Sequence, residues 1–253
     1  MELEDFFREN PKAALGFSGG VDSTYLLYAA LKAGAQVKAY YVDSPFQPRS
    51  QLQDARCLAE ELGAEFQVLE KDVLTIQKIA ENGPERCYFC KMALFSMIAD
   101  RAREDGYRLV IDGTNASDDQ ADRPGMRALL ELGVRSPLRA CGLTKQKIRA
   151  LSRDAGLSTW DLPANSCLAT RIRTGERISA QSLSRAEYAE NALRSMGFRD
   201  FRVRLYGQAA ILQLRDDQLM EAARRRGEVL ERLAPYFEKV LLDLQERECE
   251  EIN

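Results

Sequence analysis

Strand-like apolar runs alternate with helical segments between residues 13 and 111, and this alternation limits the fold more than any other feature of the chain. Runs of strand length occupy residues 13–17, 37–42, 65–69 and 109–111. Segments with apolar residues at helical spacing occupy residues 22–32, 50–62 and 90–104, and a glycine follows each of them. Strands that alternate with helices of this length predict βαβ units in a parallel sheet, so the expected fold class is α/β.

The residues after 178 predict a second, smaller domain of the α+β class. Helical patterns at residues 180–196 and 217–233 surround two strands within residues 201–214, and a last strand is expected at residues 240–244. We therefore expect two domains, residues 1–178 and residues 179–253. Between the two patterns, residues 117–127 are polar and predict a loop. Residues 144–155 predict a helix with Thr144 as its N-cap.

Composition excludes several classes of protein. The 253 residues are 45% hydrophobic and 30% charged, as in a soluble globular protein. No apolar run has the length of a membrane span, and the acidic start MELEDFFREN is unlike a targeting peptide. We therefore expect a cytoplasmic protein without a membrane partner. The net charge of −3 argues against a large nucleic-acid surface.

The absence of histidine restricts the chemistry further. With no histidine in the sequence, no imidazole can ligate a metal or transfer protons near neutral pH. Any metal must therefore be held by thiolates or carboxylates. Acid–base chemistry must use Lys, Asp, Glu, Tyr or Cys side chains.

A glycine-containing loop between the first strand and the first helix is a candidate anion site. It consists of Ser18, Gly19, Gly20, Val21, Asp22 and Ser23. Two glycines allow a tight turn with N–H groups aimed at an anion, and the helix N-terminus adds its partial positive charge. The serine hydroxyls can donate hydrogen bonds, and Asp22 can hold Mg²⁺ through water. The alternative is an ordinary glycine turn with a serine N-cap.

Three of the six cysteines lie in settings that favour chemistry. Cys87 and Cys90 occur in GPERCYFCK at the start of a predicted helix, beside Arg86 and Lys91, and Cys167 occurs in PANSCLATRIR between polar and basic residues. Nearby cations and a helix N-terminus favour the thiolate form of cysteine. Three thiols without histidine do not make a structural zinc site, but they can hold a [4Fe–4S] cluster with one open iron. A redox dithiol and a pair of buried structural cysteines are the alternatives for Cys87 and Cys90. The setting of Cys57 on a predicted helix favours a core position.

The loop of residues 18–23 resembles the pyrophosphate loop of the N-type ATP pyrophosphatases, the PP-loop superfamily. Members cleave ATP between the α and β phosphates, adenylate an acyl or carbonyl oxygen, and release pyrophosphate. The resemblance implies ATP and Mg²⁺ as cofactors, with the six loop residues at the phosphates. It also implies that Asp43, Gly113 and Thr114 border the adenosine, whereas their plain interpretation is turn residues at strand ends.

Four motifs together resemble the LarE family, the ATP-dependent sulfur transferases of nickel-pincer cofactor synthesis. They are SGGVDS, NGPERCYFCK, DGTN and PANSCLATRI, of which the CLATR segment is the most specific. The resemblance implies an enzyme that adenylates a carboxylate of pyridinium-3,5-dicarboxylate mononucleotide and converts it to a thiocarboxylate. Sulfur then comes from Cys167 itself, which becomes dehydroalanine, or from a [4Fe–4S] cluster on Cys87, Cys90 and Cys167. The three-cysteine pattern favours the cluster.

The resemblance also implies roles for several cations. Lys91 is a candidate for the transferring phosphates, with a solvated helix lysine as the alternative. Arg202 and Arg204 share one face of a predicted strand and are expected at the substrate phosphate, together with Arg171. A solvated strand face is the alternative for the first two. The family also implies a homo-oligomer, often a hexamer.

Two rival functions follow from the same motifs. A tRNA thiolase of the same superfamily would adenylate a base carbonyl, although the acidic net charge and the CLATR segment argue against it. A nucleotide-sensing module would bind ATP without chemistry. Binding of tRNA with a steep salt dependence identifies the first rival. ATP binding without pyrophosphate release identifies the second.

Overall fold

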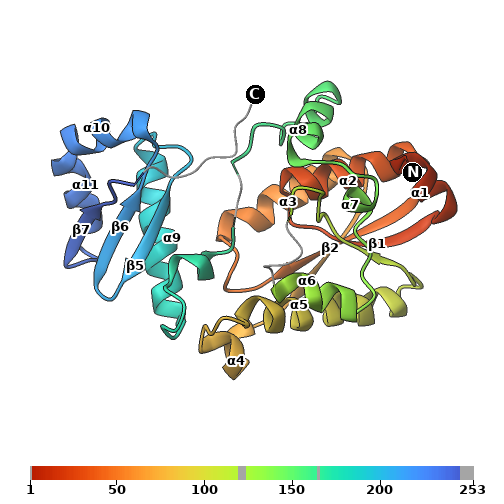
Figure 1. The fold of residues 1–253 in the computed structure, drawn as a ribbon, viewed down its shortest axis with the longest axis horizontal. Helices are drawn as coiled ribbons and strands as arrows, with labels where there is room; N and C mark the ends of the chain where they lie inside the picture. The colour runs from red at the N-terminus through yellow and green to blue at the C-terminus, as the bar shows by residue number, and fades with distance from the viewer. Residues whose placement is uncertain (1, 119–123, 164–165, 246–253) are drawn as a thin grey trace. The chain divides into compact units, whose positions relative to one another are not determined.

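The computed structural model describes residues 2–118, 124–163 and 166–245, and the chain forms two compact units (Figure 1). Residues 2–73 and 84–163 belong to the first unit, and residues 74–83 and 166–245 belong to the second. The sequence analysis assigned residues 166–178 to the first domain. In the structure this segment belongs to the second unit. Within the described ranges, no helix combines the length and the apolar character needed to cross a bilayer.

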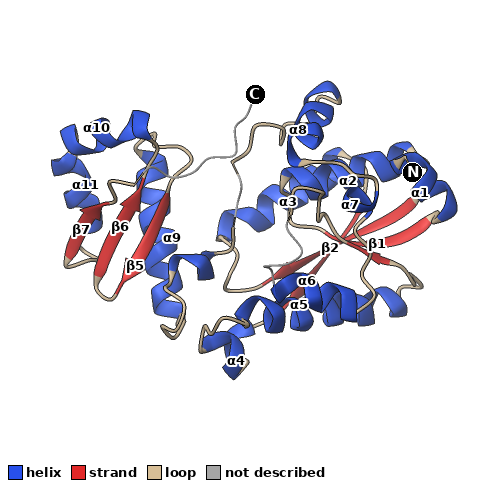
Figure 2. Ribbon diagram, viewed as in Figure 1, coloured by secondary structure: helices blue, strands red, loops and turns tan. Residues whose placement is uncertain are grey.

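The first unit contains a four-stranded sheet in the order β3-β2-β1-β4, with all strands parallel; Figure 2 labels its two central strands, β1 and β2. The strands are β1 (Lys12–Gly16), β2 (Gln36–Asp43), β3 (Glu65–Glu70) and β4 (Val110–Ile111). This order and direction confirm the predicted α/β class. Because β1 lies between β2 and β4, the loop that follows β1 leaves the sheet beside the ends of both neighbours.

Helices cover both faces of this sheet (Figure 1). One face carries α1 (Leu3–Glu9), α2 (Val21–Lys32), α3 (Arg49–Glu61), α7 (Pro137–Ala140) and α8 (Lys145–Asp154). The other face carries α5 (Arg86–Glu104) and α6 (Pro124–Glu131). Successive side chains of β1 point to opposite faces of the sheet. Leu15 belongs to the same buried hydrophobic cluster as Leu26, whereas Ala14 belongs to the cluster that contains Ile98.

The second unit contains a smaller mixed sheet. Strand β5 (Arg202–Tyr206) pairs antiparallel with β6 (Ala209–Gln213), which pairs parallel with β7 (Lys239–Leu242). Three helices accompany it, α9 (Ala180–Ser195), α10 (Asp216–Arg224) and α11 (Arg226–Leu233). Leu193 of α9, Val203 of β5 and Leu212 of β6 share one buried cluster. This arrangement matches the expected α+β pattern.

A short excursion of the chain, residues 74–83, belongs to the second unit. It contains α4 (Gln77–Ala80) and the last two residues of the short helix η1 (Val73–Thr75). Asn82 is fully buried with a φ of 55°, and its side-chain amide donates to the carbonyls of Arg173 (2.9 Å) and Glu176 (3.1 Å). The amide therefore anchors the excursion immediately before the GPERCYFCK segment.

Four local expectations are wrong. Helix α5 begins at Arg86, so that Cys87 lies inside its first turn. Helix α6 begins at Pro124 inside the segment expected to be a loop, because proline is tolerated in the first turn and the helix buries an apolar face. The helix expected at residues 217–233 is divided at Arg225 into α10 and α11. Cys57 is exposed rather than in the core. Residues 119–123 of the expected loop, and Cys249, lie outside the described residues.

A polar clamp joins the end of α5 to β2. Asp105, the C-cap of α5, accepts hydrogen bonds from Lys38 (2.6 Å) and from the hydroxyl of Tyr40 (2.7 Å). These two donors lower the pKa of the Asp105 carboxyl, and burial followed by the same hydrogen bond raises the pKa of Tyr40. The ionised carboxylate therefore contributes to the stability of the folded state.

Replacement of Asp105 by asparagine should lower the free energy of unfolding near neutral pH. Because the folded-state pKa of Asp105 is depressed, its contribution is present above the ordinary aspartate pKa and is lost as pH falls through the folded value. The difference between wild type and D105N should therefore shrink in urea titrations carried from pH 7 to pH 3. Asp100→Asn, on the exposed side of the same helix, is the control. A difference that stays constant down to pH 3 would contradict this assignment.

Candidate functional site

The turn between β1 and α2 has a backbone that only glycine fits well at one position. Gly19 has a φ of +71°, in the left-handed region, and an added Cβ would lie 3.1 Å from both Cα and Cβ of Ala55 on α3. Gly20 follows as the N-cap of α2 in an extended conformation. The first N–H groups of α2 therefore emerge at the end of β1, where an anion can accept from them.

Hydrogen bonds inside the turn hold its shape. The hydroxyl oxygens of Ser18 and Ser23 lie 3.1 Å apart, and the N–H of Ser18 donates to Ser23 Oγ at 3.3 Å. Gln51 on α3 donates from its amide to the Ser18 carbonyl at 2.9 Å. The turn is thus preorganised, and both hydroxyls belong to its own hydrogen-bond network.

Asp22 is paired with a lysine that the sequence analysis did not identify. Lys145 Nζ lies 2.6 Å from Asp22 Oδ2, and Asn115 Nδ2 lies 3.4 Å from Asp22 Oδ1. Thr144 caps the helix α8, as predicted, by accepting from the N–H of Lys147, and this places Lys145 at the first helical position. Thr144 was therefore enough to predict from the sequence where α8 begins. Nothing in the sequence indicated that this lysine meets a residue 123 positions away.

The ends of the neighbouring strands lie at the same edge of the sheet. After β4, an added Cβ on Gly113 would lie 3.0 Å from the backbone nitrogen of Ser23, so the strand extension packs directly on the first turn of α2. Thr114 donates its hydroxyl to Asp112, which also accepts from Ser136 at 2.6 Å. Asp43 is the last residue of β2.

Lys91 lies against α6. An added Cβ on Gly125 would lie 3.1 Å from Lys91 Cδ, and Lys91 Nζ is 5.9 Å from the centre of the Phe95 ring. The stem of Lys91 therefore packs in the seam between α5 and α6. Its role at the phosphates stays a prediction.

Cys87 and Cys90 lie three residues apart in the first turns of α5, and this spacing places them on one face of the helix. Cys87 is exposed with Arg86 Nη2 3.3 Å from its sulfur, and Cys90 is half-buried. The helix start is fixed to α6 by Arg127, which binds the Glu85 carboxylate and stacks 4.2 Å from the centre of the Tyr88 ring. The N-terminal end of α5, which carries both thiols, is therefore held against α6 by these contacts.

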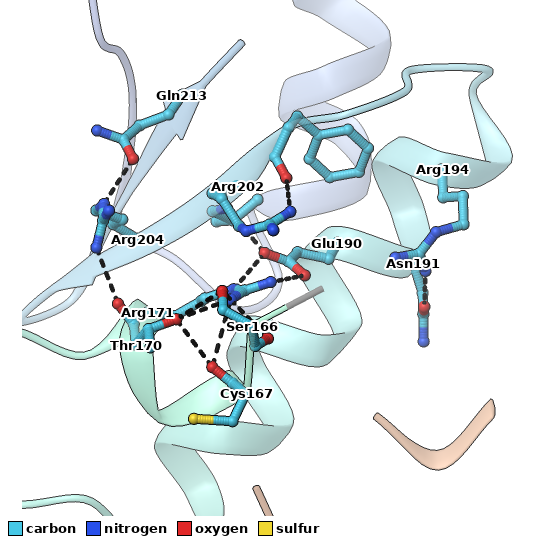
Figure 3. Close-up of polar contacts among 12 residues, drawn as sticks. Ser166, Cys167, Thr170, Arg171, Glu190, Asn191, Arg194, Arg202, Arg204 and Gln213 are labelled. Atoms are coloured by element: carbon cyan, nitrogen blue, oxygen red, sulfur yellow. Dashed lines mark hydrogen bonds and ion pairs between the residues drawn. The ribbon is translucent and has the colours of Figure 1, made fainter. Parts of the chain in front are cut away.

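Cys167 belongs to the second unit, as the N-cap of the short helix η2 (Leu168–Arg171). The expected phosphate ligand Arg171 is buried next to it, and Figure 3 shows its guanidinium surrounded by protein acceptors. Its Nε and Nη2 bind the two oxygens of Glu190 at 2.7 and 3.0 Å, and its Nη1 lies 2.7 Å from Ser166 Oγ. Its donors are thus engaged with protein acceptors, and its expected role at the substrate phosphate stays a prediction.

Arg202 and Arg204 share one face of β5, opposite the buried Val203 and Leu205, as their spacing predicts. Arg204 is exposed and donates to Gln213 Oε1 at 2.5 Å and to the Thr170 carbonyl at 2.9 Å. Arg202 donates to the carbonyl of Phe201 at 2.9 Å. The guanidinium of Arg204 therefore contacts the helix that follows Cys167. Within the described ranges, no cluster of three or more Cys, Asp or Glu side chains forms a metal-ligand set.

Comparison with known proteins gives a consistent set of relatives. A family model described as NAD synthase matches residues 6–89. The chain is 33% identical to an uncharacterised protein of Synechocystis over 99% of its own length and 95% of that protein. It is also 33% identical to the pyridinium-3,5-bisthiocarboxylic acid mononucleotide synthase of Lactiplantibacillus plantarum, over 80% of this chain and 74% of the synthase. A probable tRNA sulfurtransferase of Methanothermobacter thermautotrophicus is 26% identical, over 57% of this chain and 40% of that protein.

The two glycines of the turn should respond differently to the same substitution. Gly19→Ala places a Cβ in a left-handed backbone and against Ala55, and should lower the free energy of unfolding by about 1 to 3 kcal/mol. Gly20→Ala has an ordinary φ and an added Cβ 3.5 Å from its nearest neighbour, and should change it by less than about 1 kcal/mol. Urea denaturation measures both. Equal effects would contradict the described turn.

Proposed function

The chain belongs to the LarE family, and from that premise we propose that it is an ATP-dependent enzyme that inserts sulfur into pyridinium-3,5-dicarboxylate mononucleotide. The observation that carries the proposal is the similarity to the L. plantarum synthase, whose matched span is longer than either compact unit. A relation confined to the nucleotide-binding unit would support only ATP use. A span that includes part of both units supports the sulfur chemistry as well.

The first unit activates the carboxylate. We propose that the turn of residues 18–23 binds the phosphates of ATP, with Asp43, Gly113 and Thr114 beside the adenosine. A substrate carboxylate oxygen attacks the α phosphate, the bond to the β phosphate breaks, and pyrophosphate leaves. Asp22 is suited to hold Mg²⁺, and Lys145 is suited to neutralise the phosphate charge once the Asp22 carboxylate has turned to the metal. Lys91 remains a further candidate for the phosphates.

One of two possible sulfur sources is Cys167 itself. In this sacrificial route the Cys167 thiolate attacks the acyl adenylate, the bond to the AMP oxygen breaks, and a thioester forms. Loss of the Cα proton of Cys167 to a base then expels the thiocarboxylate and leaves dehydroalanine. Arg202 and Arg204, on one face of β5, are suited to bind the phosphate of the mononucleotide.

Three thiols also suit an iron–sulfur cluster, and we favour this source of sulfur. The donor set fits in its chemistry, because Cys87 and Cys90 share a helix face beside Arg86 and no histidine competes with thiolates as a ligand. Cys87, Cys90 and Cys167 would hold it. When bound, a [4Fe–4S] cluster with three protein ligands supplies a sulfide at its open iron and leaves Cys167 intact.

Loss of either member of the Asp22–Lys145 pair should slow adenylation. Asp22→Asn and Lys145→Met should each reduce the rate of pyrophosphate release with ATP and the dicarboxylate by about 10²-fold, since each removes a charge that faces the phosphates. Lys147→Met, on the exposed side of the same helix, is the matched control. If K145M behaves like K147M, the lysine has no phosphate role. If the wild type releases no pyrophosphate, the proposed activity itself is wrong.

The sulfur source can be read from iron content and protein mass together. Anaerobically purified protein should contain about four irons per chain, and alanine at Cys87, Cys90 or Cys167 should abolish them. Cys57→Ala, an exposed cysteine elsewhere, should leave the iron content unchanged. Iron-free protein that forms product and loses the elements of H₂S from Cys167 would support the sacrificial route instead.

A further inference from the structure

We propose that the buried Arg171–Glu190 ion pair positions Cys167 relative to strand β5, so that the sulfur donor and the two arginines of that strand form one preassembled half-site. The inference rests on the proposed function, because it takes Cys167 as the residue that gives up sulfur or would hold the cluster, and β5 as the strand that binds the substrate phosphate. Arg171 and Glu190 are positioning residues. In this inference they act through Cys167 and β5.

The pair links the Cys167 segment to helix α9. Its side chains are only 1% and 5% exposed, and the two hydrogen bonds of 2.7 and 3.0 Å make a bidentate contact. The third guanidinium nitrogen, Nη1, reaches back to the Cys167 segment itself. It lies 3.0 Å from the Ser166 carbonyl, 3.3 Å from the Cys167 carbonyl and 2.8 Å from the Thr170 hydroxyl. In Figure 3 the Cys167 side chain points away from this guanidinium, so the contact of the arginine with Cys167 is made through the backbone.

The same carboxylate links helix α9 to strand β5. Glu190 Oε1, which accepts from Arg171 Nε, also accepts from the backbone N–H of Val203 at 3.1 Å. Val203 lies between Arg202 and Arg204, so this bond fixes the strand at the centre of the arginine pair. One buried oxygen atom therefore joins the segment after Cys167 and the arginine strand.

Two further contacts join the same segments directly. Arg204 Nη1 donates to the Thr170 carbonyl at 2.9 Å, and Ile172 forms a parallel bridge with Leu205. Three independent links thus connect residues 166–172 with β5. A shift of the cysteine relative to the arginines would have to break all of them.

Stability alone does not account for such a pair. Two buried charges lose their hydration, and apolar side chains of similar size in the same place are often as stable or more stable. The pair instead fixes the orientation of the Cys167 segment relative to α9, because a planar guanidinium donates at fixed angles to Glu190 on one side and to that segment on the other. Lysine keeps the charge but not this geometry, and glutamine keeps one acceptor but not the ion pair.

The experiment compares two products of the same reaction. For each variant, pyrophosphate release and thiocarboxylate formation are measured in a single turnover with ATP and the dicarboxylate mononucleotide, and their ratio gives the coupling. Arg171→Lys and Glu190→Gln should lower the ratio of thiocarboxylate to pyrophosphate by about 10- to 100-fold, since an error of about 1 Å in position has effects of this size. Pyrophosphate release should fall less than thiocarboxylate formation, because the residues proposed to bind ATP lie in the other unit.

Two additional variants separate positioning from folding. The double replacement Arg171→Met with Glu190→Leu removes both charges together and should retain the fold while the ratio stays low. Arg225→Lys is the matched control, because Arg225 also binds a glutamate (Glu228, 2.9 Å) and a backbone carbonyl (Met196, 2.8 Å) in the same unit. It should lower stability without a change in the ratio.

Three outcomes would overturn the inference. An unchanged ratio in R171K and E190Q would show that the pair does not position the cysteine. A parallel fall of pyrophosphate and thiocarboxylate, with a fall in the melting temperature, would show a structural role alone. A normal ratio in the double variant would show that packing suffices. Failure of the proposed function is distinguishable from all of these, because the wild-type protein would then release no pyrophosphate.

Discussion

Close backbone packing around the turn after β1 is the constraint on which the nucleotide side of the molecule depends. Gly19 lies against Ala55 of α3, and Gly113 lies against Ser23 of α2, so that three backbone segments approach without a side chain between them. These contacts fix where the first N–H groups of α2 point. They also bring the extension of β4 next to Asp22, where Asn115 and Lys145 complete a charged cluster. A turn fixed in this way would bind the proposed phosphates without rearrangement of its backbone.

The two compact units use different means to hold their reactive groups. The first unit presents backbone donors from a glycine turn at the edge of a parallel sheet, and side chains adjust the charge there. The second unit uses a buried ion pair and a strand bridge around Cys167, with Glu190 at the centre. In the proposed reaction, adenylation requires charge compensation over an extended triphosphate, whereas sulfur transfer requires one atom to meet one carbon. The proposed roles of the two units match these different requirements.

Sequence patterns predicted the parts of this structure that depend on local signals. The alternating runs predicted the parallel sheet, and the loop of residues 18–23 appears between β1 and α2 as expected. The spacing of Arg202 and Arg204 placed them on one strand face. Contacts between distant residues were beyond such reasoning. Lys145 meets Asp22 only because α8 packs on α2. The ion pair of Arg171, which was expected at the substrate phosphate, could not be predicted because its acceptor, Glu190, lies 19 residues away on another helix.

The excursion of residues 74–83 has a consequence for how the protein can be divided. Its partners lie far ahead in the sequence: Ala80 accepts from the N–H of Ile178 at 2.7 Å, and Asn82 accepts from the N–H of Gly175 at 2.8 Å. A fragment that ends near residue 165 would keep this segment but lose these partners, and the side chain of Ile79, now fully buried, would lose its surroundings. Conversely, a fragment that begins at residue 166 would lack the amide of Asn82. The two units are therefore discontinuous in sequence, and a fragment that ends near residue 165 would expose an apolar side chain that the whole chain buries.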